Sequence, residues 1–268
     1  MESNCYLGKT RRNNIRLHDI GGVICAGNTA MIHFLLGFDP SCLRKEPYIP
    51  VCTHPPPIRA EEVGIRINPR GLLYTLPSIA SWVGADITAG ILATGIYRQD
   101  ELSMLIDIGT NGEIVIGCRD WMICCSASAG PAFEGSGVKD GMRAGEGAIE
   151  KVKITDQGNV HYTTIGGGKP RSICGSGLID ILAQLFKAGF IGRSGCLQRG
   201  VDGRIMDGDG ELEFLVVPSS QTKRSDDIVI TQPDIESLLR AKAAIFAGAN
   251  ILTKSLDIDF SDISRIYG

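Results

Sequence analysis

The chain has 268 residues with a net charge of −3, and 43% of its residues are apolar and 21% charged. This length supports one large or two small domains, and the composition is typical of a globular protein. The acidic balance gives no reason to expect nucleic acid or an anionic membrane as a partner, and no apolar run approaches the ~18 residues of a spanning helix. Residues 1–14 lack the apolar core of a signal peptide, so we expect a cytoplasmic location.

Nine cysteines occur, and none forms a C-x-x-C pair or a spacing typical of zinc or iron–sulfur sites. An odd count without an export signal favours reduced thiols that pack as small apolar side chains. Cys124, Cys125 and Cys174 lie close to glycine-rich motifs, so a redox or metal role at these three remains an alternative.

Residues 21–26 read as a strand, and residues 30–36 as a helix that Asn28 or Thr29 caps and that Gly37 and Pro40 end. His33 stands among apolar residues without a partner in sequence, which favours a packed core histidine over a ligand. The proline-rich segment 39–77 is expected to be extended or looped.

Residues 78–97 predict a helix rich in small residues, where another backbone can approach closely. Asp86 is the only charged residue between residues 78 and 97. A lone carboxylate in such a helix is either an N-cap or a functional group.

The central stretch 102–117 predicts two strands joined by a tight turn. We expect positive φ angles in the turn, because Asn-Gly supplies them readily. The turn N–H groups can point at an anion, and Asp107 at the end of the first strand can hold a hydrated Mg²⁺. The alternative is an ordinary hairpin with one exposed aspartate. The turn residues are Gly109, Thr110, Asn111 and Gly112.

The next segment predicts a strand at 121–125, a small-residue loop at 126–137, and a hairpin of strands 151–154 and 160–165 around residues 156–159. Glu134 in the loop is a weaker site candidate, since a structural role explains it equally well.

Residues 173–180 read as the opening of a helix, which the helical spacing of Leu182, Leu185 and Phe186 continues, with Gly189 as its C-terminal cap. Gly175, Ser176 and Gly177 place backbone N–H groups at its start, where the helix dipole favours phosphate. Further on, a strand is expected at 212–217, and a helix begins at 231–234.

The sequence ends in what reads as the start of a buried strand, at 262–267. Such a strand needs continuation, so we expect the chain to be a piece of a longer protein.

Three features stand in a fixed order: the small-residue helix with Asp86, the D-x-G-T hairpin, and the G-S-G helix start. This order resembles the actin-like ATPase superfamily of acetate and sugar kinases, heat-shock chaperone ATPases and actin. The resemblance implies an α/β fold with two ribonuclease-H-like lobes, the first one incomplete. It implies a remainder of the first lobe with the connecting helix at 1–97, and a second lobe at 98–268 without its C-terminal adenosine motif.

The motifs GNTAMIHFLLGFDP, LPSIASWVGADITAGIL, LIDIGTNGEIVIG, SAGPAFEG, ICGSGLID and TQPDIESLLRAKAAI resemble the C-terminal ATPase domain of reductive activators of corrinoid proteins. That family implies an N-terminal [2Fe-2S] domain fed by a low-potential electron donor, and ATP-driven reduction of a Co(II) corrinoid protein to Co(I). A homodimer is compatible with it.

By this resemblance Asp86 and Asp107 are the catalytic and metal-binding residues, which hold hydrated Mg²⁺ or orient the attacking water. The hairpin residues Gly109, Thr110, Asn111 and Gly112 bind the phosphates of ATP. Gly175, Ser176, Gly177 and Lys242 border the nucleotide.

Departures from the family pattern qualify these expectations. No second D-x-G-T motif precedes residue 107, the cluster cysteines are missing, and Ser172 stands where glycine is expected. We therefore expect weak or no ATPase activity from this chain alone. Two alternatives remain: a small-molecule kinase of the same superfamily, and a non-catalytic module that only docks a corrinoid protein.

Overall fold

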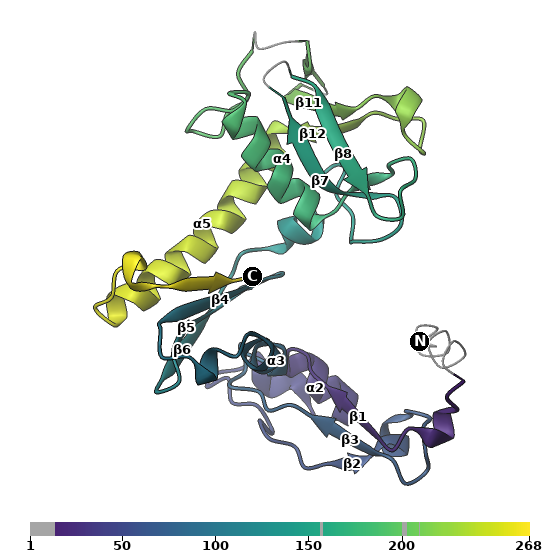
Figure 1. Cartoon of the computed structure of the whole chain (residues 1–268), viewed down its shortest axis with the longest axis vertical. Coiled ribbons are helices and arrows are strands. Elements are labelled where there is room, and N and C mark those ends of the chain that lie inside the picture. Colours follow the sequence, from purple (N-terminus) through teal and green to yellow (C-terminus); the bar gives the residue numbers. More distant parts are fainter. Residues whose placement is uncertain (1–13, 156–157, 200–202, 209) are drawn as a thin grey trace. The chain divides into compact units, whose positions relative to one another are not determined.

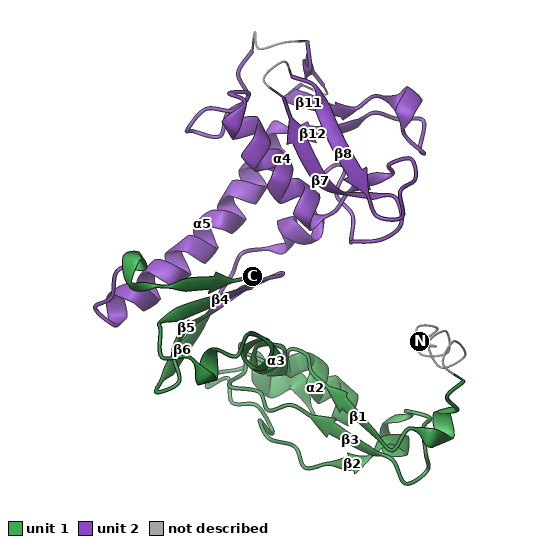
Figure 2. Cartoon of the chain, viewed as in Figure 1, with its two compact units in different colours: residues 1–105, 115–125, 260–267 green, residues 106–114, 126–259, 268 purple. Residues whose placement is uncertain are grey.

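The computed structural model describes residues 14–155, 158–199, 203–208 and 210–268 (Figure 1). Cys5 and residues 156–157 of the expected hairpin turn lie outside this part. The chain divides into two compact units, which Figure 2 colours separately. Unit 1 holds residues 1–105, 115–125 and 260–267, and unit 2 holds residues 106–114, 126–259 and 268.

The first sheet of unit 1 has the strand order β1-β3-β2. β1 (Gly22–Cys25) confirms the first predicted strand and runs parallel to β3 (Leu72–Thr75), while β2 (Ile58–Arg59) pairs antiparallel with β3. The segment 39–77 was expected to be extended or looped, and at β3 it is extended and pairs with β1, which comes from far away in the sequence. Two 3₁₀ helices also lie in this segment, at Pro40–Leu43 and Ala60–Val63.

Helix α2 (Thr29–Leu36) follows β1 and confirms its predicted caps. The Asn28 side chain accepts the N–H of Met31 at 2.9 Å, and Gly37 adopts a left-handed conformation at the C-terminal end. His33 is fully buried. Its Nδ1 bonds to the Thr29 carbonyl at 2.8 Å, and its Nε2 accepts the N–H of Val51 at 3.1 Å, as expected of a core histidine.

Helix α3 (Ala85–Thr94) is shorter than the helix predicted at 78–97. The N–H of Ala85 donates to the Gly27 carbonyl at 2.9 Å, and a Cβ on Gly84 would lie 2.5 Å from the Asn28 Cα. This close approach to the start of α2 fixes the N-cap at Gly84 and excludes helix before it. One apolar face of α3 joins a buried cluster in unit 1, formed by Val83, Ile87, Ile91, Ile96, Leu105 and Val115.

A four-stranded sheet with the order β13-β4-β5-β6 contributes residues to both units. The hairpin of β4 (Ser103–Ile108) and β5 (Gly112–Gly117) confirms the prediction for the central stretch, and β6 (Met122–Ala127) confirms the strand after it. β13 (Arg265–Tyr267) pairs in parallel with β4, so the C-terminal residues do form a strand.

Unit 2 contains two further sheets. The first has the order β8-β7-β9, in which β7 (Ala148–Ile154) and β8 (Val160–Thr164) form the predicted hairpin and β9 (Ser172–Ile173) runs parallel to β7. The second is antiparallel, with β11 in the middle. Its strands are β10 (Ile205–Asp207), β11 (Leu212–Val217) and β12 (Ile228–Thr231).

Two long helices complete unit 2, α4 (Gly175–Lys187) and α5 (Gln232–Ser255). Both begin where the sequence predicts them, and Thr231 caps α5 by accepting the N–H of Asp234 at 3.2 Å. Buried Asp140 pairs with Arg224 at 2.5 Å and accepts the N–H of Val229 at 2.8 Å. These contacts hold the segment around Asp140, which precedes β7, against the antiparallel sheet.

Candidate functional site

The turn between β4 and β5 is the centre of the candidate site, and it lies in unit 2. Asp107, near the end of β4, is exposed, as is Thr110 at the tip. The N–H of Gly109 donates to the Asn111 carbonyl at 2.9 Å and closes the turn. An anion at this turn would therefore meet the later N–H groups rather than that of Gly109.

The expected positive φ angles do not occur at this turn. Neither Asn111 nor Gly112 has one, and Gly109 has none either. Gly112 has a different physical reason to lack a side chain, since an added Cβ would lie 2.5 Å from the Ile245 Cγ1 of α5. Glycine at position 112 thus serves close packing against α5 rather than turn geometry.

Glu134 connects this turn to a second part of the site. It ends the 3₁₀ helix η5 (Pro131–Glu134), and its Oε2 accepts a hydrogen bond from the Thr110 hydroxyl at 2.7 Å. A Cβ on Gly109 would lie 3.8 Å from the Glu134 Oε1. The carboxylate is thereby held beside the turn, and a residue that the sequence marked only weakly becomes a full member of the site.

The second part is a cavity of about 380 Å³ at the start of α4. Glu134 lines it together with Arg143, Cys174, Gly175 and Ser176. The N-terminal N–H groups of a helix and an arginine both favour an anion, while the glutamate limits where one can sit. The sequence offered no signal for Arg143, because it lies in an irregular loop whose path depends on distant contacts.

The glycines at the start of α4 are required for packing. A Cβ on Gly175 would collide with the Phe133 carbonyl oxygen, and one on Gly177 with the Ile149 carbonyl oxygen. Both carbonyls belong to the backbone, so they cannot rotate away. The G-S-G pattern therefore lets α4 seat directly against η5 and β7, and this seating places the helix start beside Glu134.

The remaining predicted residues lie elsewhere. Lys242 is exposed on α5, three residues before Ile245, the residue that contacts Gly112. Asp86 lies in unit 1 as the second residue of α3, where its Oδ1 accepts the N–H of Ile87 at 2.9 Å. It is therefore a first-turn acidic residue and not the N-cap. Because Asp86 and Asp107 belong to different units, their joint role in holding Mg²⁺ stays a prediction.

The described residues contain no cluster of three or more histidine, cysteine, aspartate or glutamate side chains suited to hold a metal ion. Within the same residues, no helix combines the length and the apolar character that crossing a membrane requires.

Comparison with known proteins connects this geometry to a family. The family model for the C-terminal domain of RACo, the ASKHA domain, matches residues 101–268, and the model for the RACo middle region matches residues 4–99. ASKHA domains are actin-like ATPase domains. A solved structure named as a reductive activator for corrinoid, iron-sulfur protein superposes with a TM-score of 0.89 at 47% identity, covering 97% of this chain and 42% of that one.

Two curated relatives agree with this assignment. The corrinoid activation enzyme RamQ of Eubacterium limosum is 34% identical over 264 residues, which cover 96% of this chain and 44% of RamQ. The [Co(II) methylated amine-specific corrinoid protein] reductase of Methanosarcina barkeri is 29% identical over 212 residues, or 71% of this chain and 36% of the reductase. The chain thus spans less than half the length of these relatives. The two family models together account for nearly all of it, and the chain belongs to the RACo family of reductive activators of corrinoid proteins.

Proposed function

We propose that the β4–β5 turn and the start of α4 bind the phosphates of MgATP. The observation that carries this proposal is the hydrogen bond from Thr110 to Glu134, because it holds the turn next to the anion-favouring end of α4. Asp107 would hold the Mg²⁺ ion through water, and the ion would neutralise phosphate charge. Asp86 would act with Asp107, and Lys242 would border the nucleotide.

We further propose the activity of the whole protein: ATP hydrolysis supports the reduction of a Co(II) corrinoid protein to Co(I). The names of the relatives support this proposal, since one is a corrinoid activation enzyme and another a reductase for a Co(II) corrinoid protein. Electrons would come from a low-potential donor through a [2Fe-2S] domain, and this chain would supply the nucleotide-dependent part. Residues 1–97 would form part of the first ribonuclease-H-like lobe with the connecting helix, and residues 98–268 would form the second lobe. The whole protein would act as a homodimer.

The test uses the whole protein with Asp107→Asn. Removing the charge while keeping the shape should reduce ATP turnover sharply, at least about tenfold, because a metal-holding carboxylate loses its charge-assisted contact. Asp120→Asn is the matched control, since Asp120 is an exposed aspartate outside the site. ATP turnover is followed by phosphate release, and Co(I) formation by absorption spectroscopy.

If Asp107→Asn leaves turnover unchanged, the assignment of the site is wrong. If corrinoid reduction proceeds equally well without ATP, the turn has no part in driving it, and the non-catalytic docking role is favoured.

A further inference from the structure

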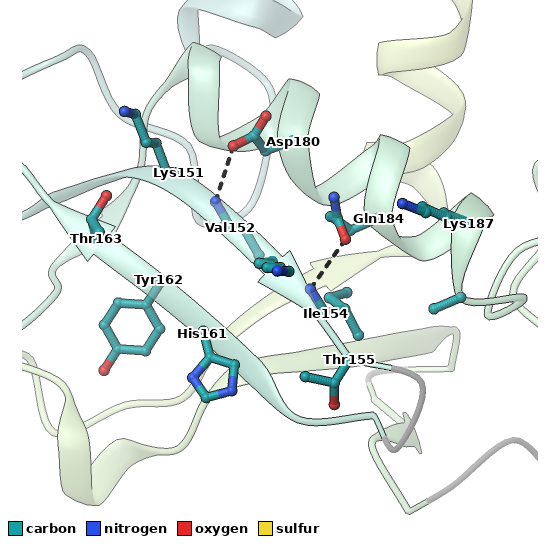
Figure 3. A pocket seen from close by; sticks show the side chains of 12 residues that line it. Lys151, Val152, Ile154, Thr155, His161, Tyr162, Thr163, Asp180, Gln184 and Lys187 are labelled. Atoms are coloured by element: carbon teal, nitrogen blue, oxygen red, sulfur yellow. Dashed lines mark hydrogen bonds between the residues drawn. The ribbon is translucent and has the colours of Figure 1, made fainter.

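A second cavity in unit 2 is larger than the one beside Glu134 and shares no lining residue with it. Its volume is about 650 Å³, and it lies between α4 and the β7–β8 hairpin (Figure 3). Small-molecule sites in proteins have volumes of about 300–1,000 Å³. The cavity is therefore of a size that fits a small ligand.

Side chains of α4 build one wall of this cavity. Asp180 Oδ2 accepts the N–H of Val152 at 3.1 Å, and Gln184 Oε1 accepts the N–H of Ile154 at 3.2 Å (Figure 3). Asp180 and Gln184 are one helical turn apart on α4. Beyond the short strand β9, their side chains accept the backbone N–H groups of β7 that a neighbouring strand would otherwise bind. These bonds fix the distance between helix and strand, and the wall is preformed.

The other wall carries positive charge. Lys151 and Lys153 are two residues apart on β7, so their side chains leave the same face of the sheet, and the cross-strand partner of Lys153 is His161. Lys187 lines the cavity from the last turn of α4, where it also complements the helix dipole.

The cavity carries an excess of positive charge. Its lining includes these three lysines and one carboxylate, that of Asp180, which already accepts a backbone N–H. Lys151 and Lys153 are exposed, and in the described part of the chain none of the three lysines forms an ion pair. Three ammonium groups on the lining of one cavity favour an anion there. The chain as a whole is acidic, so the cluster is a local feature and not a consequence of composition.

We propose that this cavity binds a small molecule that carries at least two phosphate or carboxylate groups. The lysines of β7 supply charge-assisted hydrogen bonds, and the hydroxyl groups of Thr155 and Thr163 on the same lining supply further donors. The volume of about 650 Å³ suits a small ligand. The proposal does not depend on nucleotide binding at the β4–β5 turn.

The experiment is calorimetric titration of inorganic pyrophosphate, and separately of citrate, into the chain. We expect binding of at least one probe. Affinity should fall at least about tenfold in Lys151→Gln/Lys153→Gln, because two charge-assisted contacts are lost, and it should weaken as salt is raised. Lys223→Gln is the control, an exposed lysine of unit 2 outside the cavity, and should stay within about twofold of the parent chain. Thermal unfolding confirms that each variant is folded.

Three results would overturn the proposal. One is that neither probe binds the folded chain. Another is that binding survives the double lysine change unaltered, which would place the probe at a different site. The third is that small anions do not bind, whereas an acidic partner protein binds and its binding requires the lysines. The cavity would then be part of a protein interface.

Discussion

Gly177→Ala separates two explanations for the glycines that open α4. Gly177 is the third residue of the helix and is buried. If it were present only for flexibility, alanine would raise stability by about 0.8–1 kcal/mol through helix propensity. The structure predicts the opposite sign. An added Cβ would overlap the Ile149 carbonyl oxygen and lie 2.8 Å from the Ile173 Cγ2.

Overpacking of a buried site costs about 1–3 kcal/mol, and here the obstacle is a backbone carbonyl of β7 that cannot turn aside. Because this obstacle is backbone, we expect a cost in the upper part of that range, about 2–3 kcal/mol, and subtracting the propensity gain of about 0.8–1 kcal/mol leaves a net loss of about 1–2 kcal/mol in the free energy of unfolding. Gly168→Ala is the control, because nothing lies within 4 Å of a Cβ there and its φ is not positive. It should change stability by no more than about 0.5 kcal/mol.

The assay for both variants is urea unfolding followed by circular dichroism. The reasoning is refuted if Gly177→Ala is as stable as the parent chain or more stable. That result would mean that α4 is not seated against β7 as described, and the glycine pattern would then need a functional explanation.

Three further predictions concern other contacts. Thr110→Val removes the hydrogen bond to the η5 carboxylate and should weaken MgATP binding about fivefold in calorimetry with an unchanged melting temperature, since an ordinary hydrogen bond is worth about 1 kcal/mol. Asp140→Ala leaves the Arg224 guanidinium without its buried partner and should cost about 3–5 kcal/mol of stability in urea unfolding; a loss below about 1 kcal/mol would contradict the buried pair. Burial raises the pKa of the Cys124 thiol, so at pH 8 little of it is thiolate; peptide mapping should show iodoacetamide modifying exposed Cys196 first, and equal rates would contradict the burial.

The elements that the sequence predicted well are those whose signals are local. The N-cap of α2 at Asn28 and the residue that ends it, Gly37, lie within ten residues of each other, and both act as expected. The β4–β5 and β7–β8 hairpins show the same agreement between pattern and ladder. In each case neighbouring residues alone determine where the element begins and ends.

The sequence-based predictions miss elements whose bounds or pairing depend on residues far away in the chain. α3 starts at residue 85 because Gly84 packs on the start of α2, more than fifty residues earlier. The sequence of β3 does not show that β1 pairs with it. The buried strand β12 was missed because it leads directly into α5. No pattern within these segments shows the neighbour that arrives from elsewhere.

The candidate site shows the same division. The turn at 109–112 and the helix start at 175–177 were both identified from the sequence, but the positive φ angles expected of the Asn-Gly pair do not occur. Close packing, which the sequence does not show, requires glycine at 112, 175 and 177. Glu134 gained its place only when η5 was seen between the two motifs, and Arg143 only as part of the cavity lining. The two glycine-rich motifs can be recognised in the sequence, whereas the residue that connects them in space, Glu134, cannot.

The central claim is that the β4–β5 turn binds the phosphates of MgATP, and calorimetric titration of MgATP into this chain tests it most directly. We expect a measurable heat of binding that is lost in Asp107→Asn and retained in Lys223→Gln. A folded chain that gives no heat of binding, or one that binds MgATP equally well with Asp107→Asn, would contradict it.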